Sequence, residues 1–220
     1  MKVGTKSVLF GAHCFFIHPW FLAWAWWKLY GFPWDPRLWV AFFIHDLGYW
    51  GKPNMDGPEG ERHPEWAAYW MSRLFHRFRQ PDPHATVTME PGEALVRPGS
   101  GRPYYLGRWG TFVLYHSRFY AKKYFQRPSR LCIADKLAIC LTPWWLYRIT
   151  AGMTGEIREY RGVAAARSEG DHERPELSDR DWYRGMQAYV RRWVEEHRDG
   201  RADTWTPDSR EARDETGVWS

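Results

Sequence analysis

Apolar residues recur at helical spacing over most of the chain, and strand-like alternation occurs only in a short run at residues 85–89. Several helical runs begin with a proline or follow a small polar residue, which are the usual signals of a first helical turn. We therefore predict an all-α fold. The predicted helices span residues 19–31, 37–46, 64–78, 104–117, 130–151, 154–168 and 178–197.

For three of these helices the sequence also predicts a position, a kink or a buried face. Helix 37–46 is apolar on nearly all sides, which predicts a central position in the fold. Pro143 is expected to kink helix 130–151. In helix 64–78 apolar side chains follow at helical spacing, and we expect this stripe to pack in the core. It consists of Trp66, Trp70, Met71, Leu74, Phe75 and Phe78.

An apolar run near the N-terminus is the only segment that suggests a membrane helix. It covers the 14 residues 14–27, whereas a helix that crosses a bilayer needs about 20 apolar residues. The run also contains His18 and Pro19. We therefore predict a buried helix and no membrane span.

Changes in composition along the chain suggest three parts. Residues 1–152 are predicted to form the main helical domain, residues 153–198 a C-terminal helical extension, and residues 199–220 a polar tail that is mobile or loosely docked. A stretch rich in proline and glycine at 80–103 predicts a long loop, and 170–176 a linker. The apolar face of helix 178–197 fits either the core or a second copy of the chain, so a homo-oligomer is one expectation.

The overall composition narrows the class of protein. The chain of 220 residues is 44% hydrophobic and 18% aromatic, with 16 tryptophans, which excludes a disordered protein. The net charge of +5 fits anionic substrates as well as ordinary surface, and no cluster of five Lys/Arg favours nucleic-acid binding. The three cysteines have apolar neighbours, and the N-terminus shows no signal-peptide pattern. A reduced, cytoplasmic protein is the expectation.

Residues of the types that ligate metals recur in one order along the chain. The order is His18, the pair His45-Asp46, His63, His116 and Asp135, with separations of 27, 17, 53 and 19 residues. A His-Asp pair alone is a weak signal, but this one ends an apolar run, where buried polar groups must find partners. A metal is a suitable partner for both groups. We therefore predict a metal-dependent enzyme, with His13 as a competitor of His18 for the first position.

The residues around these positions resemble the motifs of the HD-domain metalloenzymes, most of which are phosphohydrolases. The resemblance covers roughly residues 7–142 and implies an HD-domain-like helical bundle, followed here by the C-terminal helical extension. The segments that carry it are residues 18–25, 43–48, 60–64, 115–117 and 133–136.

The resemblance implies a metal pair bridged by Asp46. One metal would be held by His18, His45, Asp46 and Asp135, and the second by Asp46, His63 and His116. The metals expected for such ligands are Mn, Fe, Ni, Co or Zn, with Mg as a further possibility. The implied activity is that of a nucleotidase or phosphodiesterase acting on a small phosphorylated substrate, with a nucleotide as the expected class.

The chain also departs from known subgroups of that family. It has no Gly-Tyr-Pro segment and no Glu-Asp dipeptide, so the cyclic-dinucleotide and alarmone subgroups are disfavoured. Many members have lysine where Tyr49 stands, and Lys52 is the candidate that takes over as a catalytic phosphate contact, with an exposed loop lysine as the alternative. Residues 54–61 suit either a surface turn or a substrate rim. The basic residues between the last two ligands suit either solvent or substrate phosphate: Arg118, Lys122, Lys123, Arg127, Arg130 and Lys136.

Two other functions fit the same residues. Some HD-type proteins use a di-iron pair with these ligand types for oxygenation, and the ligands alone do not separate the two chemistries. A non-catalytic module that binds a metal or a nucleotide is the third alternative.

Overall fold

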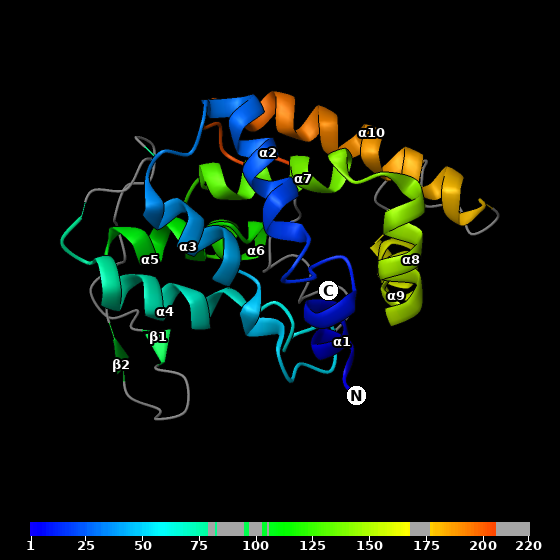
Figure 1. Cartoon of the computed structure of the whole chain (residues 1–220), viewed down its shortest axis with the longest axis horizontal. Coiled ribbons are helices and arrows are strands. Elements are labelled where there is room, and N and C mark those ends of the chain that lie inside the picture. Colours follow the sequence, from blue (N-terminus) through cyan, green and yellow to red (C-terminus); the bar gives the residue numbers. More distant parts are fainter. Residues whose placement is uncertain (79–81, 83–94, 97–102, 105, 168–176, 206–220) are drawn as a thin grey trace.

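The computed structural model describes residues 1–78, 82, 95–96, 103–104, 106–167 and 177–205. Within these ranges the fold is all-α, as predicted, apart from a two-residue antiparallel pair of strands. Figure 1 shows the arrangement of the elements. In chain order these are α1 Val3–Phe10, α2 His18–Tyr30, α3 Pro36–Ile44, the 3-10 turn η1 Leu47–Tyr49, α4 Pro64–Phe75, β1 Leu95–Val96, β2 Pro103–Tyr104, α5 Arg108–Leu114, α6 Arg118–Lys123, α7 Arg130–Leu141, α8 Trp144–Thr154, α9 Glu156–Arg167 and α10 Asp179–His197.

The predicted starts of α3, α7 and α10 are confirmed by their capping contacts, whereas the helix predicted over 104–117 spans only Arg108–Leu114, because Pro103–Tyr104 forms β2. The side chain of Asp35 accepts a hydrogen bond from the backbone N–H of Arg37 at the start of α3. The hydroxyl groups of Ser129 and Ser178 cap α7 and α10 in the same way. Prolines occupy the first turns of α2 and α4.

The predicted helix 130–151 is two helices rather than one kinked helix. Helix α7 ends at Leu141, and α8 begins at Trp144 after Pro143. Thr142 has extended backbone angles, because a proline disfavours the helical conformation of the residue before it. The short helices α1 and α6 were not predicted. The strand-like run 85–89 and the linker 170–176 lie outside the described residues.

Helix α7, rather than α3, occupies the centre of the fold. It packs against α2, α5 and α10, and most of its side chains are buried. The prediction that helix 37–46 is central was wrong, because α3 buries only one face, formed by Leu38, Ala41 and Phe42. Its other apolar side chains are half-exposed, so an all-round apolar pattern does not require all-round burial.

The aromatic stripes on α2 and α4 are also more exposed than predicted. In α4, Met71 is buried and Phe75 half-buried, but Trp66, Trp70 and Leu74 are exposed, as is Phe78 beyond the end of the helix. Helix α2 buries Leu22, Ala23, Ala25 and Trp26 and leaves its other three tryptophans exposed. Among the described helices, none is long and apolar enough to cross a membrane.

The C-terminal helices are tied closely to the rest of the molecule. Trp193 and Val194 of α10 pack against Cys132 and Ile133 of α7. The predicted boundary at residue 152 falls inside α8. Glu156, the first residue of α9, is fully buried and accepts the backbone N–H of Ala12.

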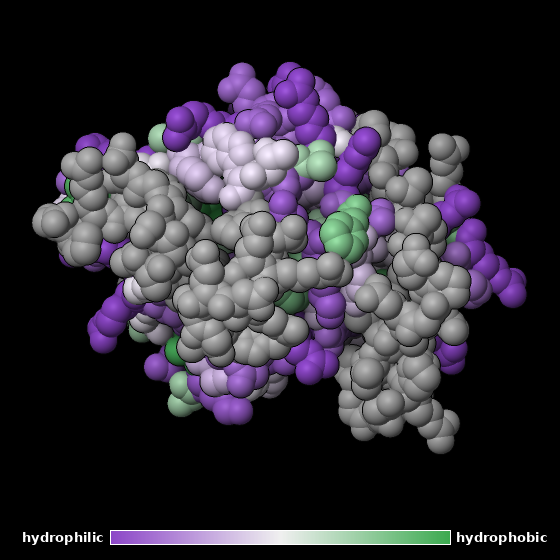
Figure 2. Space-filling model, turned by 180° about the vertical axis from the view of Figure 1, so that it is seen from behind, coloured by the Kyte–Doolittle hydropathy of each residue, from purple (hydrophilic) through white to green (hydrophobic). Residues whose placement is uncertain are grey.

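The first residues of the predicted polar tail are docked, which corrects the expectation of a loosely attached segment. Asp203 is only 5% exposed. Its carboxylate accepts hydrogen bonds from Arg118 and from the indole of Trp193, and its backbone carbonyl accepts one from Lys122. Figure 2 shows the molecule from behind, where most of the described residues at the rim are hydrophilic.

Candidate metal centre

The six predicted ligand residues lie together, although they come from distant parts of the chain. Each of the six residues lies at or next to the end of a helix, or in the middle of one. His18 opens α2, and His45-Asp46 follows the last turn of α3. His63 precedes α4, His116 follows α5, and Asp135 lies in the middle of α7. All six residues are buried, and none is more than 7% exposed.

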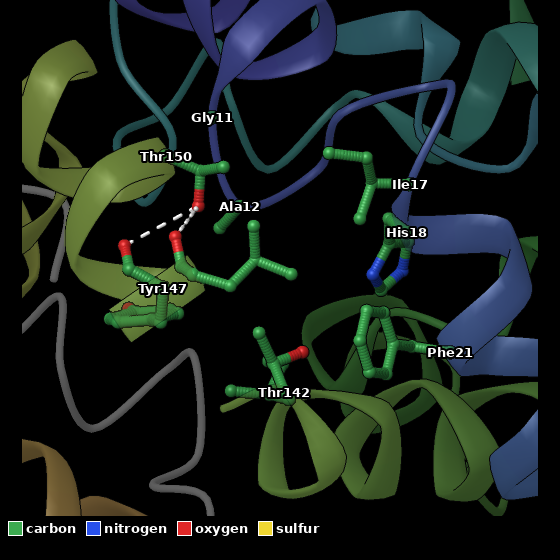
Figure 3. A pocket seen from close by; sticks show the side chains of 10 residues that line it. Gly11, Ala12, Ile17, His18, Phe21, Thr142, Tyr147 and Thr150 are labelled. Atoms are coloured by element: carbon green, nitrogen blue, oxygen red, sulfur yellow. Dashed lines mark hydrogen bonds between the residues drawn. The ribbon is translucent and has the colours of Figure 1, made fainter. Parts of the chain in front are cut away.

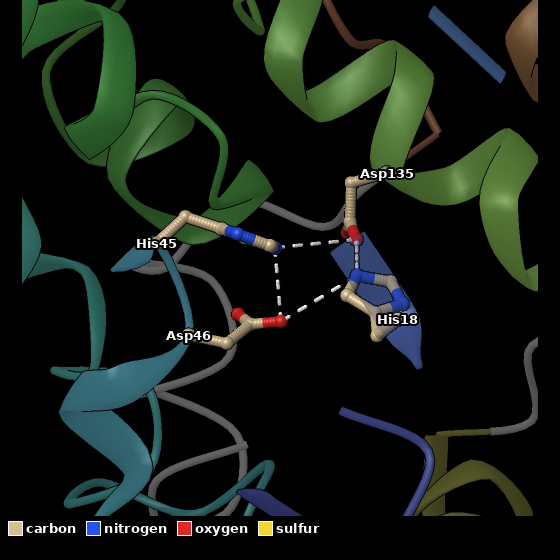
Figure 4. Close-up of side chains that lie close together, drawn as sticks. All are labelled: His18, His45, Asp46 and Asp135. Atoms are coloured by element: carbon tan, nitrogen blue, oxygen red, sulfur yellow. Dashed lines mark hydrogen bonds and ion pairs between the residues drawn. The ribbon is translucent and has the colours of Figure 1, made fainter. Parts of the chain in front are cut away.

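His18, His45, Asp46 and Asp135 form the first group of candidate ligands. Figure 4 shows the four side chains pointing toward one another. The Nε2 atom of His18 lies 2.9 Å from Oδ1 of Asp135 and 3.7 Å from Oδ2 of Asp46. The Nε2 atom of His45 lies 2.9 Å from the same Asp46 oxygen and 3.7 Å from Asp135 Oδ1. Two imidazoles and two carboxylates therefore converge on one point.

Asp46, His63 and His116 form the second group. The Nε2 atoms of His63 and His116 lie 3.6 and 3.5 Å from Oδ1 of Asp46. Asp46 thus directs Oδ2 to the first group and Oδ1 to the second. A carboxylate placed in this way could serve both groups of candidate ligands if each held an ion.

The imidazole rings are held so that the same nitrogen faces the cluster in each case. The Nδ1 atoms of His45, His63 and His116 lie 3.0, 2.8 and 2.5 Å from the backbone carbonyl oxygens of Phe42, Gly60 and Val113. A carbonyl oxygen only accepts, so Nδ1 carries the proton in each ring. When the ring is neutral, the lone pair is then on Nε2, which is the form that binds a metal.

Two further features fit the presence of cations. His45 Nε2 and Asp46 Oδ2 are buried and face each other at 2.9 Å without the geometry of a hydrogen bond, so a cation held by both would be a better partner for each. The Nε2 atoms of His63 and His116 are 3.0 Å apart, and their Nδ1 contacts leave a lone pair on each. Two lone pairs at this distance repel, and a cation bound to both removes the repulsion. The nitrogen and carboxylate donors suit divalent transition metals.

The electrostatics keep the carboxylates charged and two of the imidazoles neutral. Burial alone raises the pKa of Asp46 and Asp135, but the neighbouring cationic groups, His45 for Asp46 and Lys136 for Asp135, outweigh it and hold each pKa well below its usual range. Burial lowers the pKa of His63 and His116, despite the opposing charge of Asp46. Deprotonated carboxylates and neutral imidazoles are the states that ligate metals.

His45 behaves differently from these two imidazoles. Burial lowers its pKa, but the charges of Asp46 and Asp135 outweigh burial and raise the pKa to about 10. In the absence of a metal, His45 therefore carries the proton that balances the two carboxylates. A divalent cation would take over this role and displace the proton.

Among the described residues, Lys136 contacts the centre directly, and the catalytic role predicted for Lys52 stays a prediction. The ammonium group of Lys136 lies 3.0 Å from Oδ2 of Asp135. The backbone carbonyl of Lys52 accepts a hydrogen bond from Gly4 N–H. Besides burial, the neighbouring charges that act on the pKa of Lys52 are those of Arg62, Glu65, Glu59 and Lys2, which lie outside the cluster. Arg118 and Lys122 reach Asp203 instead.

Tyr49 stacks on a ligand imidazole, a role that sequence reasoning missed. Its ring lies 3.8 Å from that of His63 at an interplanar angle of 13°. The tyrosine therefore holds the plane of this imidazole, in addition to the Gly60 carbonyl. Its place directly after the glycine of the His-Asp-x-Gly segment was the available sequence signal.

His13 and Glu156 support the centre from outside. The imidazole of His13 lies 5.8 Å from that of His18, between centroids, and contacts Ser7 Oγ at 2.9 Å and Glu156 at 3.7 Å. It belongs to neither ligand group. Glu156 is 144 residues from Ala12, whose N–H it accepts, and nothing in the local sequence links the two segments.

A small cavity of about 20 Å³ lies beside His18, between α2, α7 and α8. Figure 3 shows the His18 imidazole at its edge, next to Ile17 and Phe21. The lining is mostly apolar and contains no lysine or arginine. It consists of Gly11, Ala12, Ile17, His18, Phe21, Ile139, Thr142, Leu146, Tyr147 and Thr150.

Comparison of the chain with protein-family models, with curated proteins and with solved structures finds no match.

Proposed function

We propose that this protein is a metal-dependent phosphohydrolase of the HD type that uses a pair of divalent transition metals. The observation that carries the proposal is the position of Asp46, whose two carboxylate oxygens face two separate groups of buried ligands. The order of the six residues along the chain, which resembles that of the HD-domain enzymes, supports the same assignment.

In this proposal His18, His45 and Asp135 hold one metal together with Asp46, while His63 and His116 complete the second site. Mn, Fe, Ni, Co and Zn all suit these donors. Once bound, such a pair polarises a phosphoryl oxygen and lowers the pKa of a water molecule, so that hydrolysis proceeds near neutral pH. The chain fixes the imidazoles through the Nδ1 contacts and excludes bulk water from the ligands by burying them.

The proposed substrate is a small phosphorylated molecule, with a nucleotide as the favoured class. The net charge of +5 is compatible with an anionic substrate. Lys136 is placed to balance negative charge beside the metals, because it already pairs with Asp135 and is partly exposed.

Replacing Lys136 with glutamine tests whether Lys136 or Lys52 stabilises the negative charge of the phosphoryl group. We expect Lys136→Gln to lower kcat/KM by about 10–1000-fold with metal content retained, since a cation near the phosphoryl group stabilises its developing charge. Lys52→Ala is the matched variant. A loss of this size in Lys52→Ala, with Lys136→Gln within about twofold of wild type, would return the catalytic role to Lys52.

A di-iron oxygenase is the second candidate, because the types of the six buried donors do not separate the two chemistries. The cavity beside His18 has room for about one water molecule and does not favour either substrate class. The same six ligands would serve a pair of iron ions.

An anaerobic assay separates the two candidates. The purified protein would be analysed for metals and then screened against phosphorylated substrates with added Mn, Co, Ni or Mg, under nitrogen. The expected result is phosphate release without oxygen, abolished by a chelator and restored by metal. Turnover that requires oxygen would instead identify an oxygenase.

A further inference from the structure

Three exposed tryptophans form a row along the outer side of α2. Trp20, Trp24 and Trp27 are 57%, 44% and 58% exposed. Their spacing of four and three residues places them on one face of the helix. The opposite side of α2 is buried against α7. The three tryptophans therefore form a separate, solvent-exposed side of the helix.

Further aromatic side chains extend this row at both ends. Phe16 is 69% exposed, Phe32 44% and Trp34 84%. The ring of Phe32 lies 5.9 Å from that of Trp27 and 4.5 Å from that of Trp34, between centroids. We call these six side chains the aromatic face: Phe16, Trp20, Trp24, Trp27, Phe32 and Trp34.

The charge of the aromatic face is positive. Residues 16–34, which contain the whole face, include a single residue of the types Lys, Arg, Asp and Glu, the exposed Lys28. The next two charged residues, Asp35 and Arg37, neutralise each other in a two-point ion pair. The ammonium group of Lys28 lies 5.2 Å from the Trp24 ring centroid, within the face itself. The face therefore combines amphipathic aromatic rings with uncompensated positive charge.

We propose that the aromatic face docks on the surface of an anionic lipid membrane. Tryptophan suits this environment because its ring enters the acyl boundary while its indole N–H stays at the headgroups. Cations beside the rings attract anionic headgroups. The proposal is independent of the chemistry at the metal centre and does not require the phosphohydrolase assignment.

Charge also argues against a second copy of the chain as the occupant. A symmetric dimer through this face would place the same patch of each subunit against the other. Lys28 of each copy would then approach Lys28 of the other, and residues 16–34 contain no acid that could compensate the two charges. A negatively charged lipid surface complements the face, whereas another copy of it does not.

The test is co-sedimentation of the full-length protein with vesicles, one set of phosphatidylcholine alone and one containing phosphatidylglycerol. We expect the anionic vesicles to bind at least about tenfold more tightly, and added salt to weaken binding. The triple variant Trp20→Ser/Trp24→Ser/Trp27→Ser should lower binding by more than about tenfold. Equal binding to both vesicle types, or none to either, would overturn the proposal.

A pair of charge reversals locates the binding surface without touching the tryptophans. Lys28→Glu, on the aromatic face, is expected to weaken binding to anionic vesicles about tenfold. Lys123→Glu, on the exposed part of α6, changes the net charge equally and should stay within about twofold of wild type. Equal losses in both variants would show that net charge, not this face, controls binding.

Light scattering of the protein without lipid tests whether a second copy of the chain binds the aromatic face. A monomer that binds anionic vesicles supports membrane docking. A dimer that the triple tryptophan variant converts to a monomer would assign the face to a second copy and overturn the proposal.

Discussion

Replacing Asp46 with asparagine is expected to remove bound transition metal from both sites at once. The carboxylate lies between the two groups of ligands, with Oδ2 2.9 Å from His45 Nε2 and Oδ1 3.5 Å from His116 Nε2. Asparagine keeps the shape but loses the charge that two cations share. Any hydrolytic activity should fall at least about 1000-fold, because both metals take part in activating water and substrate. Elemental analysis of the purified variant measures the metal directly.

The control for this variant is Asp199→Asn, at a carboxylate whose side chain is 82% exposed. It should retain the metal content and activity of the wild type. A His63→Ala variant adds a second comparison, since this residue belongs to only one group. We expect it to lose one metal and keep the other. An Asp46→Asn protein with wild-type metal content would exclude the bridged pair.

Replacing Asp203 with alanine is expected to lower the free energy of unfolding by about 2–4 kcal/mol. The Asp203 side chain is 2% exposed and pairs with Arg118, whose side chain is 21% exposed. It also accepts the indole N–H of Trp193 at 3.0 Å. Removing the carboxylate leaves the charge of Arg118 poorly compensated and the indole N–H of Trp193 without its acceptor. The partial exposure of Arg118 keeps the expected cost below that of a fully buried pair.

Urea denaturation of Asp203→Ala beside Asp199→Ala gives the measurement, and the second variant should change the unfolding free energy by less than about 0.5 kcal/mol. A chain that ends at residue 199 should be destabilised at least as much as Asp203→Ala, because it lacks the same partner. Equal stability of Asp203→Ala and wild type would show that residues 199–205 are a loosely attached tail after all.

Local sequence signals identified the starts of five helices and the residue types of the candidate metal ligands. The caps at Asp35, Ser129 and Ser178 and the prolines at the first turns of α2 and α4 act over a few residues, so they can be recognised without knowledge of the fold. The six candidate ligands could likewise be named in advance from their order and the resemblance. Their convergence in space is consistent with that prediction, while their function as ligands stays a prediction.

Packing partners could not be determined in this way. The apolar pattern of helix 37–46 and the stripe on α4 did not reveal which side would be covered, because that depends on the helices that pack against them. As a result α7 is central, whereas Trp66 and Trp70 are exposed. Polar contacts between distant parts of the chain could not be predicted from the sequence either. Asp203 binds Arg118, and Glu156 holds Ala12, across separations that leave no periodic pattern in the chain.

The sequence by itself determined the all-α class, the helix starts marked by a cap or a first-turn proline, and the candidate ligands, because short-range backbone and side-chain preferences express each of them locally. Only the tertiary structure decided that the two oxygens of Asp46 face different ligand groups. It likewise decided that Lys136 rather than Lys52 contacts the centre, and that a row of tryptophans on α2 faces outward. These features depend on how distant helices are oriented against one another, which the burial of their largest apolar faces determines.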